Sequence, residues 1–86
     1  MKVIIPSPLH SYTGEKRSIE AAGATLAALL HDMDAQYPGI RFRIIDEQGN
    51  IRRHIKIFVN RQQVRSLDIA LNANDEIVLV AALSGG

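Results

Sequence analysis

One segment of the 86-residue chain has a helical pattern long enough to constrain the fold. Between Thr25 and Pro38, apolar residues recur at helical spacing and form one stripe: Leu26, Leu29, Leu30, Met33 and Tyr37. Thr25 can cap the free amides of the first turn, and Pro38 with Gly39 ends the helix. A helix with one apolar face must bury that face against another layer, and the flanking segments indicate which kind.

Two short strand patterns precede the helix. Residues 2–6 are rich in β-branched side chains, and Pro6 and Pro8 end the pairing because proline lacks the ladder donor. The Thr13-Gly14-Glu15 segment is typical of a turn, after which residues 17–20 can return as the second strand of a hairpin.

The part of the chain after the helix predicts further strands. In residues 54–60, Ile55, Ile57 and Val59 share one face, which we expect to pack on the helix. We also expect a short strand at 64–65, a helical turn at 67–71 and a final strand at 76–82. One helix packed on one face of a mixed sheet is an α+β domain.

The composition is that of a folded protein without covalent cross-links. Hydrophobic residues make up 47% and charged residues 22%, and no cysteine is present for a disulfide or a thiolate zinc site. The longest apolar run, 77–83, is short of the roughly 20 residues that span a bilayer. Residues 1–6 lack the apolar region of a secretory signal. We therefore expect one domain over residues 1–86, in the cytoplasm and not in a membrane.

The residue types that usually carry catalysis do not form a recognisable set. His10, His31 and His54 lack the spacing of metal ligands, and Ser84 has no histidine or aspartate nearby in the sequence. No glycine-rich phosphate loop is found either. The sequence predicts a protein that is not itself an enzyme and that binds no metal or cofactor.

Basic residues gather in one part of a chain whose formal net charge is only +1. Between Arg41 and Arg65 there are seven basic residues and two acidic ones. This segment could be a docking face for an acidic partner or for nucleic acid, or an ordinary solvated face. Its aromatic residues, Phe42 and Phe58, are too few for a base-stacking platform, so we expect no nucleic-acid partner.

The most distinctive feature is the final sequence Leu83-Ser84-Gly85-Gly86. Glycines without Cβ atoms can enter a narrow cleft, and residues 84–86 can extend roughly 10 Å beyond the last strand. The terminal carboxylate is ionised at neutral pH and is a poor electrophile, so another enzyme would have to activate it. The alternative is a frayed glycine terminus without a function.

Several motifs together make the whole chain resemble one family. Besides the order of elements and the Gly-Gly end, they are Thr25-Leu26 at the helix start, Ile57-Phe58-Val59-Asn60, and Asn74-Asp75-Glu76-Ile77 before the last strand. In this combination the chain resembles the ubiquitin-like sulfur carrier proteins. They include the small subunit of molybdopterin synthase and the carriers of thiamine and cysteine biosynthesis. Residues 12–14 and 34–40 look most similar to carriers that feed cysteine synthesis or thiocarboxylate natural products.

The resemblance implies a β-grasp fold and the role of a protein cosubstrate, free as a monomer. In such proteins an adenylyltransferase similar to the ubiquitin-activating enzymes uses ATP and magnesium to convert the terminal carboxylate to an acyl adenylate. A sulfur donor then displaces AMP. The product is a thiocarboxylate on Gly86 for a sulfur-acceptor synthase, and Gly85 and Ser84 give access to it.

Partner contacts are expected near the tail and on the outer face of strand 54–60. Leu83 stands where the tail leaves the sheet, and Ala81 and Ala82 stand where many relatives have proline, which makes this tail less stiff. Phe58 is expected either to anchor a partner or to cover a second small core. Two other functions stay open: the small subunit of a molybdopterin synthase, and a ubiquitin-like interaction domain with an inert tail.

Overall fold

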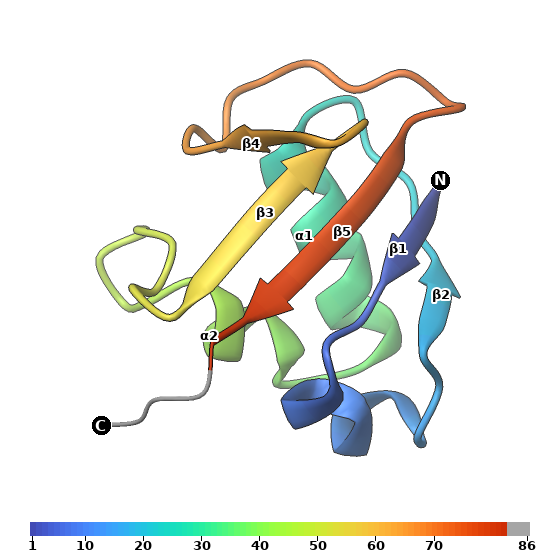
Figure 1. Ribbon diagram of the computed structural model, residues 1–86, viewed down its shortest axis with the longest axis vertical. Helices are drawn as coiled ribbons and strands as arrows, with labels where there is room; N and C mark the ends of the chain where they lie inside the picture. Colours follow the sequence, from blue (N-terminus) through green and yellow to red (C-terminus); the bar gives the residue numbers. More distant parts are fainter. Residues whose placement is uncertain (83–86) are drawn as a thin grey trace.

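The computed structural model describes residues 1–82, which form a mixed sheet with helices on one face (Figure 1). The strands are β1 (Lys2–Ile4), β2 (Ser18–Glu20), β3 (Ile55–Val59), β4 (Gln62–Val64) and β5 (Glu76–Ala81). The helices are α1 (Leu26–Gln36), α2 (Ile40–Ile44) and a 3-10 helix at Ser7–Thr13. None of the helices in residues 1–82 is long and apolar enough to cross a membrane.

The last strand lies in the centre of the sheet, whose order is β2-β1-β5-β3-β4. It runs parallel to β1, with Val3 opposite Ile77, and antiparallel to β3, with Ile57 opposite Leu79. Strands β1 and β2 form the predicted antiparallel hairpin. Residues 77 and 78 of β5 are therefore paired on both sides, whereas its C-terminal half, residues 79–81, pairs with β3 alone.

The core lies between the sheet and α1, as the two apolar patterns predict. The helix contributes four side chains with no exposed surface, Leu26, Leu29, Leu30 and Met33. From β3, Ile55 and Ile57 are buried, and Val59 is half-buried and packed against the same cluster. The α+β arrangement and the face of β3 that packs on the helix are both confirmed.

The start of α1 is capped from two sides. The hydroxyl of Thr25 accepts a hydrogen bond from the Ala28 amide at 3.2 Å, as predicted. The first helical amides donate to distant carbonyls: Leu26 N to Ile69 O at 3.1 Å, and Ala27 N to Leu67 O at 2.9 Å. The prediction of a helical turn at 67–71 is wrong in its helical part: the structure has a turn at residues 67–68 and a β-bridge from Ala70 to Thr25, and the segment satisfies the free amides of the helix start.

Two short helices were not predicted from the sequence. The 3-10 helix at Ser7–Thr13 ends at Gly14, whose φ of 64° is left-handed. Helix α2 begins after Gly39, whose φ is 97°, and the Asp34 carboxylate accepts hydrogen bonds from the amides of Gly39 and Arg41, each at 3.1 Å. The strand expected at 64–65 lies at 62–64 instead.

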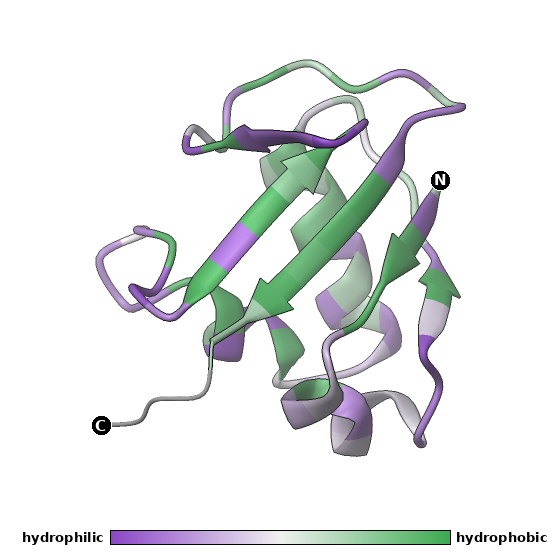
Figure 2. Ribbon diagram, in the orientation of Figure 1, coloured by the Kyte–Doolittle hydropathy of each residue, from purple (hydrophilic) through white to green (hydrophobic). Residues whose placement is uncertain are grey.

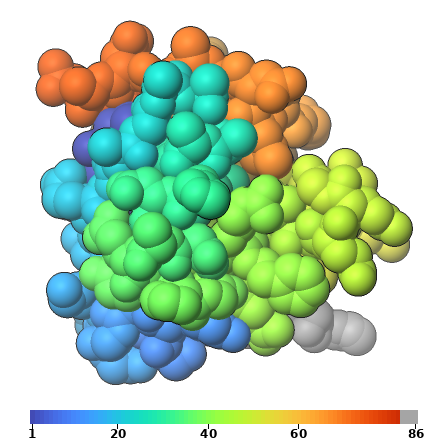
Figure 3. All heavy atoms as spheres, turned by 180° about the vertical axis from the view of Figure 1, so that it is seen from behind, coloured from blue at the N-terminus to red at the C-terminus, as the bar shows by residue number. Residues whose placement is uncertain are grey.

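The two faces of the sheet differ in what covers them. Seen from behind, α1 crosses the middle of the molecule and hides β5 (Figure 3). On the opposite face β3 and β5 are open to view, and both are largely hydrophobic, whereas β4 is hydrophilic (Figure 2). No helix lies over this outer face of the sheet in the view of Figure 1.

Candidate functional site

The site starts at the end of β5, which leads to the predicted tail. Leu83, Ser84, Gly85 and Gly86 lie outside the described residues. The residues just before them are well defined: Ala81 pairs with Ile55, and the amide of Ala82 donates to the carbonyl oxygen of His54 at 2.8 Å. Ala81 is half-buried against the core, and Ala82 is exposed. The chain is thus held to β3 through Ala82.

A hollow of about 430 Å³ adjoins this point, since His54 is one of its lining residues. Another is Phe42 in α2, which is 51% exposed. The Arg52 guanidinium lies over the Phe42 ring, 4.6 Å from its centroid, and Arg52 Nε donates to the Phe42 carbonyl at 2.7 Å. The stacked pair presents an aromatic ring and a cation beside the exit of the last strand.

Phe42 was not among the predicted site residues, although the sequence held a signal for it. Ile40 and Ile44 are both fully buried and stand one helical turn apart. A residue halfway between them must face outward. The spacing of Ile40 and Ile44 is this signal, but it indicates an exposed Phe42 only if residues 40–44 are taken as a helix, and α2 was not predicted.

The outer face of the sheet carries the predicted contact residue Phe58. In the register of the sheet, Val78 lies opposite both Phe58 and Ile4, and Val80, 40% exposed, lies opposite Lys56. We call Ile4, Phe58, Val78 and Val80 the outer-face patch. Phe58 is half-buried and lies outside the core cluster, against which its neighbour Val59 packs. Its role as a partner contact stays a prediction.

The opposite end of β5 is fixed by a polar bracket. Asn60 Nδ2 donates to Asp75 Oδ1 at 2.9 Å, and Asn60 Oδ1 accepts from the Glu76 amide at 3.0 Å. Asp75 Oδ2 accepts from the Asn72 amide at 2.8 Å. These hydrogen bonds, first that from Asn72 and then that from Asn60, hold the pKa of Asp75 below its ordinary value. Both ends of the strand that carries the tail are therefore anchored.

The histidines are dispersed over the molecule. His10 Nε2 donates to the Ile5 carbonyl at 2.7 Å, while His31 and His54 are exposed. In the part of the chain that the structure describes, no three histidine, aspartate or glutamate residues gather as a possible metal site.

Comparison with known proteins places these features in a family. The ThiS family matches residues 3–86. Sulfur carrier protein CysO of Mycobacterium tuberculosis is 36% identical over 89 residues, covering 98% of this chain and 96% of CysO. A chain in the crystal structure of the Amycolatopsis orientalis BexX/CysO complex superposes with a TM-score of 0.90 at 32% identity, covering 99% and 98% of the two chains. The crystal structure of SAMP1 from Haloferax volcanii superposes with a TM-score of 0.80 at 26% identity, and the match covers 100% of this chain and 98% of SAMP1.

The chain belongs to the ThiS family, the ubiquitin-like sulfur carriers. The resemblance seen in motifs such as Thr25-Leu26 and the Gly-Gly end is confirmed, and so is the β-grasp fold. The prediction of a sulfur carrier is confirmed with it. Among the carriers of this family, the similarity to CysO supports the type that serves cysteine biosynthesis.

Proposed function

We propose that this chain carries its sulfur as a thiocarboxylate on Gly86 and supplies it to a biosynthetic enzyme, with cysteine or a thiocarboxylate-dependent metabolite as the product. The observation that carries the proposal is the anchoring of the central strand β5 through Ala82. The four residues that follow end in two glycines, which a narrow active site can accept. Similarity to CysO over nearly the whole chain supports the cysteine branch.

In the proposed reaction this chain is a cosubstrate and its partners are the enzymes. A carboxylate oxygen of Gly86 attacks the α-phosphorus of ATP, and pyrophosphate leaves. Sulfide from a donor then attacks the carbonyl carbon of the acyl adenylate, and AMP leaves with one carboxylate oxygen. The net change on the chain is the replacement of one oxygen by sulfur. ATP and magnesium are bound by the activating partner and not by this chain.

The proposed activating partner is an adenylyltransferase similar to the ubiquitin-activating enzymes, and a sulfur-acceptor synthase consumes the product. The outer-face patch suits such a partner because it is apolar and lies on the sheet that carries the tail. The Phe42–Arg52 pair offers a second contact beside the end of β5. Complex formation by a relative, in the A. orientalis BexX/CysO structure, supports docking of this kind.

Exchange of labelled pyrophosphate into ATP by the cognate adenylyltransferase tests the activation step. The wild-type chain should support exchange. Gly86→Ala, or an alanine appended after Gly86, should block or strongly slow it. The first change adds a Cβ atom to a tail that must enter a narrow active site, and the second converts the carboxylate of Gly86 into an amide. Asp68→Asn, a change at an exposed position between β4 and β5, is the matched control and should leave the rate unchanged. Exchange that is indifferent to the appended residue contradicts the proposal.

Two further measurements separate the alternatives. A small subunit of molybdopterin synthase copurifies with a large synthase subunit, whereas a carrier of the proposed type is isolated without one. An interaction domain with an inert tail binds its partner equally well after deletion of Gly85 and Gly86.

A further inference from the structure

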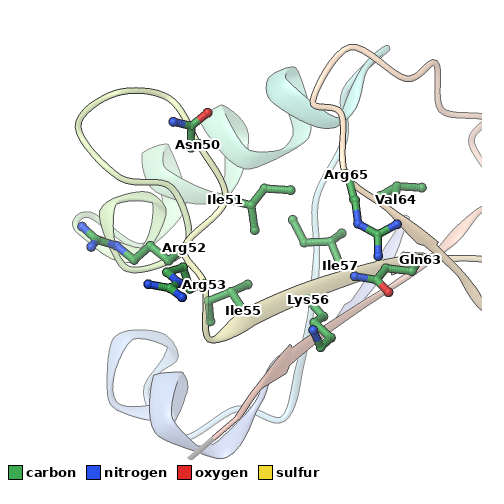
Figure 4. Close-up of a pocket in the computed structure, with 10 residues that line it drawn as sticks. All are labelled: Asn50, Ile51, Arg52, Arg53, Ile55, Lys56, Ile57, Gln63, Val64 and Arg65. Atoms are coloured by element: carbon green, nitrogen blue, oxygen red, sulfur yellow. The ribbon is translucent and has the colours of Figure 1, made fainter. Parts of the chain in front are cut away.

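A groove with a basic rim lies beside β3 and β4 (Figure 4). Its volume is about 330 Å³. Four of the residues that line it are cationic, namely Arg52, Arg53, Lys56 and Arg65, and none is acidic. We refer to it as the basic groove. More than half of the basic residues in the segment 41–65 line this groove.

The fold brings these cations together from separate segments. Arg52 and Arg53 precede β3, and Arg65 follows β4. The β3–β4 pairing, with Ile57 opposite Val64, closes the distance between them. In Figure 4 the two arginines before β3 lie at one end of the groove and Arg65 lies on the β4 side, with Ile51 and Ile57 between them.

None of the cations of the groove takes part in a salt bridge with a residue of the range 1–82. The single ion pair in that range joins the Met1 ammonium to Glu20, at 3.3 Å. The nearby Asp46 carboxylate faces its own loop, where it accepts hydrogen bonds from the amides of Gln48 and Asn50 at 2.9 Å each. Cations that share one groove repel each other, and a bound anion relieves that repulsion.

We propose that the basic groove binds an acidic, extended segment of a partner protein. Charge complementarity favours an acidic ligand. A peptide is favoured because β4 is an edge strand of the sheet and borders the groove, so a segment can run beside it. The half-buried side chains of Ile51 and Val64 add an aliphatic floor. No aromatic ring lines the groove, which argues against stacking of nucleic-acid bases.

The proposal concerns binding alone, so its test needs neither the activating enzyme nor the chemistry at Gly86. The test is an NMR titration of the isotope-labelled full chain with a deca-glutamate peptide. At an ionic strength of about 0.01 M the Debye length is about 30 Å, and we expect amide shifts at residues 50–57 and 63–65. Near 1 M salt the Debye length is about 3 Å, and the shifts should vanish.

Two charge-reversal variants locate the binding. Arg53→Glu combined with Arg65→Glu should weaken binding by at least about tenfold. Lys16→Glu combined with Arg17→Glu makes the same change in net charge at exposed positions before β2, and should weaken it by less than about twofold. The amide spectrum of each variant reports whether it is folded.

Three results overturn the proposal. Equal weakening by both variant pairs would mean that only net charge matters. Shifts spread over the whole chain, or no shifts at low salt, would exclude a site. Tighter binding of deca-thymidylate than of deca-glutamate to the same amides would assign the groove to nucleic acid instead.

Discussion

The amide of Ala82 donates a hydrogen bond to the carbonyl oxygen of His54 at 2.8 Å, one residue beyond the end of β5. Pairing between β3 and the C-terminal segment thus continues past the strand. It fixes the position from which the last four residues of the chain extend. The account of this protein as a sulfur carrier depends on that anchoring and on the glycines that follow.

Ala82→Pro tests the anchor directly. Proline lacks the amide that reaches His54, so the variant should lose roughly 0.5 to 1.5 kcal/mol in the free energy of unfolding. Ala82→Ser keeps the amide and should be close to wild type. Chemical denaturation of the three proteins measures the difference. Equal stability of the proline and serine variants would show that the hydrogen bond contributes little.

Phe58→Ala should separate binding from folding. Phe58 lies on the outer face and outside the core cluster, so its truncation should leave the melting temperature near that of wild type. Affinity for the cognate adenylyltransferase should fall by about tenfold or more if the ring is an interface anchor. His31→Ala, at an exposed position of α1 on the other side of the sheet, is the control. A large loss of stability would place Phe58 in a core after all.

Leu30→Ala and Ile57→Ala should each lower the free energy of unfolding by about 2 to 5 kcal/mol. Both side chains have no exposed surface and belong to the core between α1 and the sheet. Val80→Ala, at a site that is 40% exposed, should cost less than about 1 kcal/mol. Comparable losses at all three positions would contradict the assignment of the two faces.

The bracket around Asp75 predicts a pH dependence. Its carboxylate has an ordinary pKa of 3.8, and the hydrogen bonds from Asn72 and Asn60 lower the pKa in the folded state. The stabilisation is therefore fully present above 3.8 and is lost as the pH falls through the lower, folded value. The melting temperatures of wild type and Asp75→Asn should differ most at neutral pH and converge in acid. A gap that does not change with pH would exclude this linkage.

The parts of the fold that could be predicted from the sequence are those set by the spacing of residues within one segment. The stripe on α1, its Thr25 cap and the alternation of Ile55 and Ile57 each follow from spacing within one segment. The path of residues 67–71 could not be predicted, because its carbonyl oxygens accept from amides 40 or more positions earlier in the chain. Sequence periodicity does not report which distant carbonyls will cap a helix.

The candidate site, too, could be predicted only in part. The Gly-Gly end and Phe58 could be selected from the sequence, since one is a composition signal and the other follows from strand alternation. The exposure of Phe42 depends on α2, and the basic groove depends on the β3–β4 pairing. Both features depend on tertiary structure, which the pattern within one segment does not predict. The sequence showed that basic residues cluster between positions 41 and 65, but it did not show that four of them line one groove.

The central claim concerns Gly86, and intact-protein mass spectrometry tests it most directly. The wild-type chain is incubated with its cognate adenylyltransferase, ATP, magnesium and a sulfide source. The account predicts a mass increase equal to the replacement of one oxygen by sulfur, located by fragmentation at Gly86 and absent when an alanine is appended. An unchanged mass with an enzyme shown to activate another carrier, or sulfur located at any other residue, would contradict it.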